Sequence, residues 1–369
     1  MAREGNIFQE FKIEADLAGD RTSVTMSSIL KHLPVPVIAG SLLLILTRGP
    51  SALQAAIFRV FNTPQSQQGL IISLKCVLAL GLTNQANALL TTWARNNWQL
   101  KTGQVPWKWT EEVAVVTGGS NGMGALVVKG LAAKGLKVAV LDIQPLPEDL
   151  QSLPHVAFFR CDITSVEQVK QTAKAVKVSL GAPSILCNNA GIAHAHTLLE
   201  ASTEWIRKVF DVNLISHFHL IQAFLPDMIK QKKGHIVTTA SMASFVGCAG
   251  LVDYCATKAG VLSLHEGLTQ ELKHRYNAPY IKTSIVHPIY VRTQLIKSYE
   301  NSLRQSRAVV IEPETVANAI VKQIVSGRSG QVIVPSWMSV ASGVRGWPAW
   351  LQELIRDSTA RDVVEENQQ

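Results

Sequence analysis

Tyr254 and Lys258 are the residues whose types and spacing first suggest chemistry in this chain of 369 residues. They lie four positions apart, so on a helix they project from one face and a lysine ammonium can lie beside a phenol. A free tyrosine, with a pKa of about 10, is a weak base at neutral pH, but an adjacent cation favours the phenolate. The pair can therefore exchange a proton with an alcohol. Because this spacing also recurs by chance on solvated helix faces, its meaning depends on the rest of the chain.

A glycine-rich turn is the second feature. Residues 117–124 read Thr-Gly-Gly-Ser-Asn-Gly-Met-Gly, between an apolar run at 113–116 and a helical pattern at 125–134. Glycines let the backbone turn tightly and let a pyrophosphate approach the helix N-terminus, where free N–H groups and the helix dipole favour negative charge. A strand, a glycine turn and a helix in this order predict a dinucleotide site. The turn residues expected to bind the nucleotide are Gly118, Ser120, Asn121, Gly122 and Gly124.

The next apolar run, 137–141, ends in Asp142, about twenty residues beyond the glycines. A carboxylate at this place accepts hydrogen bonds from the adenosine ribose hydroxyls and repels a 2′-phosphate. Neither the turn nor the few residues after Asp142 contain a Lys or Arg that would offset this repulsion. We therefore expect NAD as the cofactor, with NADP disfavoured. The alternative is an aspartate that only caps a turn before Pro145.

Further motifs in the same order make the chain resemble the short-chain dehydrogenase/reductase family over residues 111–335. The turn matches that family's T-G-x-x-x-G-x-G, whose spacing differs from the ordinary Rossmann pattern. The resemblance implies an α/β fold with a Rossmann-type doubly wound parallel sheet in a single catalytic domain. The apolar runs expected to form strands are 113–116, 137–141, 156–161, 184–187, 235–240 and 282–286.

The resemblance also implies four catalytic residues. Tyr254 and Lys258 match the family's catalytic pair, and Ser241, thirteen residues before Tyr254, matches its serine. Asn213 matches the asparagine that holds a proton-relay water. Ser241 and Tyr254 are then expected to hydrogen-bond the substrate oxygen, and Tyr254 to take the alcohol proton. Lys258 is expected to lower the tyrosine pKa and to bind the nicotinamide ribose. Ser244 is a rival for Ser241, but its spacing to the tyrosine differs from that of the family.

The same resemblance extends the nucleotide site. Asp162, after the run 156–161, matches the family's adenine-contacting aspartate. Residues 188–191 match its N-N-A-G motif, which lines the cofactor cleft and places Asn189, Ala190 and Gly191 in the site.

One position departs from the family's pattern. Where the family usually carries Pro-Gly-x-x-x-Thr, this chain has Ile289 after Pro288 and retains Thr293. The family's nicotinamide contacts at this place use the threonine hydroxyl and the backbone near Val291, so cofactor binding is expected to survive. The loop shape and the substrate wall are in doubt.

The part of the chain before this domain is basic and apolar. Between Arg21 and Thr110 there are eight Lys and Arg and no Asp or Glu, a charge equal to the +8 of the whole chain. Composition therefore predicts four parts: a polar N-terminal segment (1–32), a basic apolar membrane-association region (33–110), the catalytic domain (111–335) and an amphipathic C-terminal tail (336–369).

Two apolar stretches within the basic region suggest a membrane anchor. Leu33–Thr47, at about 1.5 Å per residue, is shorter than a hydrocarbon core of about 30 Å, and Gly69–Leu82 is interrupted by Lys75. Positive charge flanks both stretches, so we expect a helical monotopic anchor in one leaflet rather than a spanning helix. Tryptophans suited to a water–lipid interface follow. The alternative is that the stretches pack on the domain, with these tryptophans in its core: Trp93, Trp98, Trp107 and Trp109.

Other classes of site and partner are disfavoured. Five cysteines without a C-x-x-C pair indicate a reduced compartment. His194 and His196, like His217 and His219, have no accompanying Cys or carboxylate set, so no metal site is expected. The basic charge belongs to the apolar region rather than to a groove-facing stripe, which argues against nucleic acid as a partner.

The substrate is expected to be lipophilic. The segment 294–310, which follows Thr293, mixes apolar and basic side chains. With the N-terminal anchor and Asp142, the chain resembles the membrane-associated subgroup of retinol dehydrogenases and 17-beta-hydroxysteroid dehydrogenases on the cytosolic face of the endoplasmic reticulum and on lipid droplets. This implies NAD-dependent interconversion of a primary or secondary alcohol (retinoid, steroid or long-chain lipid) and its carbonyl. An NADPH-dependent lipid carbonyl reductase and a non-catalytic scaffold stay open as alternatives, and a homodimer stays open as the assembly.

Overall fold

The computed structural model describes residues 35–98, 105–360 and 362–363. The polar segment predicted at 1–32 lies outside these residues, as do the first residues of the stretch that begins at Leu33. The chain divides into two compact units, Met1–Thr92 and Trp93–Gln369. The second unit begins before residue 111, where the change in composition puts the boundary.

The N-terminal unit is helical. Its helices are α2 (Val35–Arg48), α3 (Ser51–Phe58) and α4 (Pro64–Arg95), which continues into the second unit. Helix α2 packs on α4 at Gly81, where a Cβ would lie 2.4 Å from Cγ of Pro36. Pro36 is tolerated because it stands in the first turn of α2, where its missing N–H breaks no helical hydrogen bond.

Helix α4 is longer than the apolar stretch that predicted it. It has 32 residues, or about 48 Å, and continues past Leu82 because residues 83–95 contain no Gly or Pro. Among the described residues it is the one helix long and apolar enough to cross a membrane. Helices α2 and α3, bent by 110°, would add a second span only if taken together. The sequence disfavoured a span at Gly69–Leu82 because of Lys75, whereas α4 continues through Lys75 and is a candidate span by length and composition.

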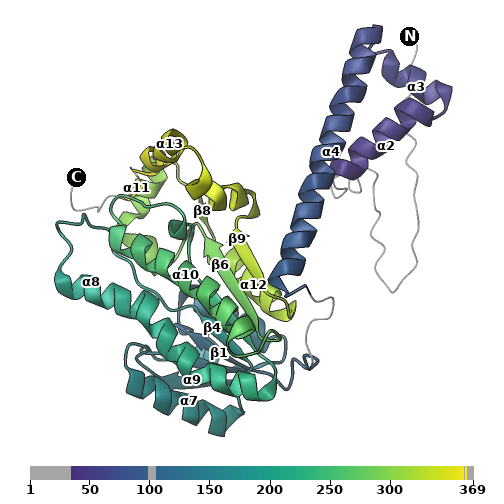
Figure 1. Ribbon diagram of the computed structural model, residues 1–369. Coiled ribbons are helices and arrows are strands. Elements are labelled where there is room, and N and C mark those ends of the chain that lie inside the picture. The colour runs from purple at the N-terminus through teal and green to yellow at the C-terminus, as the bar shows by residue number, and fades with distance from the viewer. Residues whose placement is uncertain (1–34, 99–104, 361, 364–369) are drawn as a thin grey trace, which may run out of the picture. The chain divides into compact units, whose positions relative to one another are not determined.

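The second unit is built on a seven-stranded parallel sheet with helices on both faces (Figure 1). Its strand order is β3-β2-β1-β4-β5-β6-β9, which confirms the predicted doubly wound fold. Every residue of the inner strand β1 is buried, as expected for a parallel strand covered on both sides. The strands are β1 (Val113–Thr117), β2 (Lys137–Asp142), β3 (Val156–Arg160), β4 (Ile185–Asn188), β5 (His235–Thr239), β6 (Lys282–Pro288) and β9 (Gly330–Val334).

Alternation along β1 divides the core between the two faces. Ala114 and Val116 belong to the cluster formed with helices α5 and α12, whereas Val113 and Val115 belong to the cluster with α7 and α9. Each fully buried valine contributes roughly 1.5–3 kcal/mol to stability. The helices are α5 (Gly122–Ala132), α6 (Glu148–Gln151), α7 (Val166–Leu180), α8 (Thr203–Phe210), α9 (Ser216–Gln231), α10 (Val252–His274), α11 (Glu300–Gln305), α12 (Pro313–Val325) and α13 (Ala349–Thr359).

Short elements connect and extend this framework. A two-stranded parallel sheet joins β7 to β8, and η4 leads to α13 in the C-terminal tail. The short elements are the π-helix η1 (Asp211–Ile215), the 3-10 helices η2 (Met242–Ser244), η3 (Gln294–Tyr299) and η4 (Ser336–Gly346), and the strands β7 (Tyr290–Val291) and β8 (Val310–Ile311).

The four tryptophans before the sheet divide into two pairs. Trp107 and Trp109 stack with ring centroids 5.2 Å apart and pack against the core of the catalytic unit. Trp93 and Trp98 are 41% and 57% exposed. Trp107 and Trp109 therefore agree with the alternative in which the tryptophans pack in the core of the domain. Trp93 and Trp98 have the exposure that a role at the water–lipid interface requires.

Candidate active site

The carboxyl ends of the parallel strands open into a cavity of about 940 Å³. It lies where the strand order reverses between β1 and β4, the place at which doubly wound sheets bind ligands. Ser120 and Asn213, both predicted site residues, lie behind the cavity wall and are buried. The other predicted site residues line the cavity: Gly118, Asn121, Gly122, Gly124, Asp142, Asp162, Asn189, Ala190, Gly191, Ser241, Tyr254, Lys258, Val291 and Thr293.

The glycine turn needs its glycines. Gly118 has a φ of +64°, and a Cβ on it would lie 2.9 Å from Cα of Ala190. A Cβ on Gly124 would lie 2.0 Å from the carbonyl oxygen of Gly118. Side chains at these positions would collide with backbone, so this part of the cavity is walled by main chain that a phosphate can approach.

Strand β4 holds the turn in place. The hydroxyl of Thr117 accepts hydrogen bonds from the backbone N–H groups of Asn189, at 3.0 Å, and Ala190, at 3.1 Å. The Asn189 amide in turn donates to the carbonyl of Thr117 at 3.2 Å. Asn189, the second asparagine of the N-N-A-G motif, therefore fixes the turn that follows β1.

Two carboxylates line the cavity beside the turn, at the ends of β2 and β3. Asp142 accepts hydrogen bonds from the backbone N–H groups of Ser120 and Gln144, each at 3.0 Å. Asp162 accepts from the backbone N–H and the hydroxyl of Thr164, at 3.0 and 2.7 Å. Ser120 thus supports the carboxylate of Asp142 instead of lining the cavity itself.

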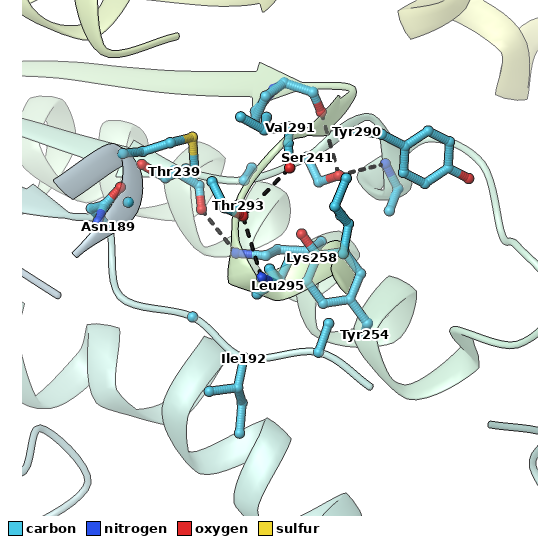
Figure 2. Close-up of a pocket in the computed structure, with 18 of the residues that line it drawn as sticks. Asn189, Ile192, Thr239, Ser241, Tyr254, Lys258, Tyr290, Val291, Thr293 and Leu295 are labelled. Carbon is cyan, nitrogen blue, oxygen red and sulfur yellow. Dashed lines mark hydrogen bonds between the residues drawn. The ribbon is translucent and has the colours of Figure 1, made fainter. Parts of the chain in front are cut away.

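The helix that the Tyr254–Lys258 spacing predicts is α10, and both side chains enter the cavity from its first two turns. Figure 2 shows them with Ser241 around one space. The ammonium of Lys258 donates to the carbonyl of Thr239 at 3.0 Å and lies 5.5 Å from the centroid of the Tyr254 ring. The hydroxyl of Ser241 accepts from the backbone N–H of Ala243 at 3.2 Å. These contacts hold the three groups in fixed relative positions.

Burial controls the protonation of Tyr254 and Lys258. It raises the pKa of Tyr254 to about 12, although a hydrogen bond with Ser241 lowers it in part. Burial also lowers the pKa of Lys258 to about 8. Burial, Ser241, Cys255 and Cys248 account for this shift, so the expected lowering of the tyrosine pKa by the lysine stays a prediction. Tyr254 carries its proton at neutral pH.

Asn213 lies in the π-helix between α8 and α9, a rare geometry that is frequent at functional sites. Its side-chain oxygen accepts from the backbone N–H of Ile192 at 2.8 Å, and its amide donates to the carbonyl of Ile192 at 2.8 Å. Asn213 thus holds the segment that follows Gly191 against the cavity. The proton-relay role implied by the resemblance stays a prediction.

The departure from the family's glycine is accommodated by strand pairing. The backbone N–H of Ile289 donates to the carbonyl of Val334 at 3.0 Å, which continues the pairing of β6 with β9. Thr293 then lies next to the glycine turn, because a Cβ on Gly122 would be 3.6 Å from its methyl group. Ile289 therefore leaves the threonine in place and adds an apolar side chain to the cavity lining.

The C-terminal tail supplies a wall whose residues sequence reasoning did not identify. Arg345 donates to the backbone carbonyls of Ser244, at 3.1 Å, and Phe245, at 3.3 Å, so the tail is tied to the loop that follows Ser241. Ser244 lies outside the cavity lining, which favours Ser241 as the serine of the site. The amphipathic composition that predicted a tail at 336–369 did not indicate which of its residues line the cavity: Met338, Ala341, Ile355, Thr359 and Asp362.

The sequence profile of the short chain dehydrogenase family matches residues 112–304, which hold the glycine turn and the Ser241, Tyr254 and Lys258 group. The chain belongs to this family. The short-chain dehydrogenase is therefore an oxidoreductase that interconverts an alcohol and a carbonyl with a nicotinamide dinucleotide, NAD or NADP.

This short-chain dehydrogenase aligns with most of the length of several curated relatives. Dehydrogenase RED2 of Cochliobolus heterostrophus is 39% identical over 212 residues, which are 57% of this chain and 78% of that protein. Human estradiol 17-beta-dehydrogenase 11 is 34% identical over 233 residues, 62% of this chain and 76% of that protein. The crystal structure of a short-chain type dehydrogenase/reductase from Mycobacterium marinum, 25% identical, superposes with a TM-score of 0.55 over 60% of this chain and 93% of that chain.

The residues of the cavity fit a nicotinamide dinucleotide. The turn at 118–124 is a cradle that side chains would fill, and Asp142 presents a fixed acceptor beside it. The buried hydroxyl of Thr239 lines the cavity and has no hydrogen-bond partner among the described residues. Among the described residues, no group of three or more His, Cys, Asp or Glu side chains is placed to hold a metal ion.

Proposed function

We propose that this short-chain dehydrogenase is an NAD-dependent enzyme that interconverts a lipophilic primary or secondary alcohol and its carbonyl. The observation that carries the proposal is that Ser241, Tyr254 and Lys258 line one cavity with the glycine turn. A nucleotide held by the turn and a substrate oxygen held by Ser241 and Tyr254 would then share that cavity.

The charge at the turn supports NAD over NADP. Asp142 is held by two backbone N–H groups at the position where an adenosine ribose would accept or donate hydrogen bonds. Among the described residues that line the cavity, the basic side chains are Lys208 and Lys258. They come from α8 and α10 rather than from the turn or β2. A 2′-phosphate would therefore meet a carboxylate without a compensating cation from those elements.

The protein groups would act on the substrate oxygen. When bound, the nicotinamide exchanges a hydride with the substrate carbon. Ser241 donates a hydrogen bond that orients the oxygen, and the Tyr254 hydroxyl, protonated at neutral pH, donates its proton to a carbonyl. In alcohol oxidation Tyr254 must release its own proton as it accepts that of the alcohol. Lys258, buried beside it with a pKa of about 8, can take that proton only in its neutral form, which becomes the major form above pH 8.

The substrate end of the cavity is largely apolar. Its wall includes side chains from the loop after Ser241, from η3 and from the tail. Human estradiol 17-beta-dehydrogenase 11, which is similar to this chain, is named for a steroid alcohol. Both observations support a steroid, retinoid or long-chain alcohol as the substrate class. The apolar wall residues are Met242, Val246, Leu251, Ile289, Leu295, Ile296, Met338, Ala341 and Ile355.

We also propose that the enzyme works at a membrane or lipid-droplet surface, on the cytosolic side. Helix α4 is a candidate membrane span, and none of the residues in its most apolar segment is buried. In the tail, Trp337 and Trp350 are each 65% exposed, whereas Trp347 and Ile355 pack inward. Exposed tryptophans of this kind suit the headgroup region, where a lipophilic substrate would be delivered.

The decisive variant is Tyr254→Phe. With retinol, estradiol and dodecan-1-ol as probes and the detergent-solubilised full chain, we expect wild-type oxidation with NAD and a loss of about 10²–10⁴-fold in kcat for the variant. NAD should still raise the melting temperature of the variant. The control is Tyr276→Phe, an exposed tyrosine outside the cavity lining. Equal turnover of Tyr254→Phe and wild type would refute the role of Tyr254, and a preference for NADPH and carbonyl probes would favour the reductase alternative.

A further inference from the structure

The tail side of the cavity carries polar groups that the proposed reaction does not use. Cys248, Tyr290, Thr359 and Asp362 all line the cavity, and we call them the tail-side cluster. Figure 2 shows Tyr290 on the opposite side of Ser241, Tyr254 and Lys258 from Asn189, so it lies away from the nucleotide end. The cluster thus belongs to the substrate end of an otherwise apolar wall.

Asp362 is the group in this cluster whose hydrogen bonding is incomplete. Asp362 is 7% exposed, and from the described residues its carboxylate accepts one hydrogen bond, from the hydroxyl of Tyr290, at the long distance of 3.4 Å. No Lys, Arg or His among the described residues forms an ion pair with it. A carboxylate has about four acceptor positions, and a buried one that lacks donors is costly. Asp362 can therefore accept further hydrogen bonds from a group inside the cavity.

The thiol of Cys248, which lies with Asp362 in the cavity lining, donates to the carbonyl of Val246 at 4.0 Å. Burial raises the pKa of Tyr290, so its phenol stays protonated and donates to the carboxylate. The part of the chain that the structure describes thus supplies one long hydrogen bond and leaves the remaining acceptor capacity of Asp362 to a ligand.

The position of Asp362 is fixed by its contacts on both sides. Its backbone N–H donates to the carbonyl of Thr359 at 3.1 Å, at the end of α13. The next residue, Val363, is buried in the cluster that contains Leu251 and Cys255. Gly250, with a φ of +77°, allows this approach, since a Cβ there would lie 2.6 Å from the carbonyl oxygen of Val363. The carboxylate is therefore held in place before any ligand binds.

We propose that Asp362, supported by Tyr290, is a second polar subsite, which accepts a hydrogen bond from a hydroxyl or ammonium group at the end of the substrate remote from the reacting carbon. The inference rests on the proposed function, since it concerns the same cavity. It narrows the substrate class from lipophilic alcohols to those that carry a second donor. The apolar wall between the two polar ends would contact the hydrocarbon body.

A length series tests this subsite. Linear 1-alkanols, α,ω-diols and ω-amino alcohols of six to sixteen carbons are offered with NAD to the detergent-solubilised full chain, and kcat/KM is expressed per hydroxyl group. We expect the diol or the amino alcohol to exceed the 1-alkanol by about 10- to 100-fold at a preferred chain length, as a hydrogen bond to a charged acceptor would give. A diol preference identifies a hydroxyl as the donor, and an amino alcohol preference identifies an ammonium.

Two variants assign that preference to the carboxylate. Asp362→Leu should abolish it and leave oxidation of the 1-alkanols within about 3-fold, and Asp362→Asn should reduce it, most of all for the amino alcohols. The control is Asp357→Asn, an exposed carboxylate on α13 outside the cavity lining, which should keep the preference. Equal values for the three series in wild type, or a preference that Asp362→Leu retains, would overturn the subsite. Failure to oxidise any alcohol would instead overturn the proposed function.

Discussion

The carboxylate of Asp142 accepts a hydrogen bond at 3.0 Å from the backbone N–H of Ser120, so a negative charge at the end of β2 is joined to the glycine turn after β1. The same side chain therefore has two effects. It supports the turn as an acceptor, and it sets the charge that a nucleotide would meet. Asparagine at this position keeps an acceptor oxygen and removes the charge, which separates the two effects.

Asp142→Asn is expected to raise the ratio of kcat/KM with NADP to that with NAD by about 10- to 100-fold, because the repulsion between the carboxylate and the 2′-phosphate is lost. Steady-state kinetics with both nucleotides measures this ratio. The control is Asp149→Asn, which removes an exposed carboxylate paired with Lys129 outside the cavity lining. A ratio that stays the same in Asp142→Asn would show that this carboxylate does not select the nucleotide.

Ser241→Ala removes the hydroxyl that lowers the pKa of Tyr254 and that would orient the substrate oxygen. We expect kcat to fall by about 10²–10³-fold, as on loss of one donor to a developing oxyanion. Ser244→Ala is the matched control, since its buried hydroxyl has no partner among the described residues and lies outside the cavity lining. Its turnover should stay within about 2-fold of wild type. The opposite order of effects would assign the role to Ser244.

The buried ammonium of Lys258 predicts a pH-dependent difference in stability. Burial lowers its pKa from 10.5 to about 8, so below pH 8 the folded protein holds a charge that water would solvate better. Lys258→Met should therefore raise the unfolding free energy on the order of 1–3 kcal/mol below pH 8, with activity lost. As pH rises from 8 towards 10.5, the folded lysine loses its proton while the unfolded one keeps it, and the advantage of the variant should disappear.

Melting temperatures of wild type and Lys258→Met between pH 6.5 and 10.5 measure this difference. Lys170→Met, an exposed lysine of α7, is the control and should show no such trend. A variant that is less stable than wild type at pH 7 would mean that the hydrogen bond from Lys258 to the carbonyl of Thr239 outweighs the desolvation of the charge.

Local patterns predicted strands β1 and β2 of the catalytic unit, because each is a largely buried run of apolar residues followed by a polar motif. The run 113–116 appears as β1, Val113–Thr117, and the run 137–141 as β2, Lys137–Asp142. Helix α5 begins at Gly122, three residues before the predicted pattern, because glycines are tolerated in a first turn whose N–H groups are unpaired.

Properties that depend on tertiary burial could not be read from spacing. The Tyr254–Lys258 spacing carries no sign of how far each group is removed from water, so it could not show that burial raises the pKa of Tyr254. Asp362 follows Tyr254 by more than one hundred residues and reaches the cavity only because Val363 packs beside Gly250. No periodicity indicates such a contact.

Cys76 offers a native reporter for the membrane arrangement of α4. It is exposed, whereas the other cysteines, Cys161, Cys187, Cys248 and Cys255, are buried or half-buried in the catalytic unit. A helix of about 48 Å that enters a hydrocarbon core of about 30 Å would place a residue of its middle portion out of reach of water-soluble reagents. Cys76 should therefore resist a charged maleimide in intact membranes and react after denaturation in SDS.

Cys76→Ala gives the background, and Ser66→Cys in that background, at the start of α4, should react in intact membranes if that end is accessible. Rapid labelling of Cys76 in membranes that resist alkaline carbonate extraction would mean that another segment holds the protein there, with α2 and α3 the next candidates because their bent pair is also apolar enough to enter a bilayer.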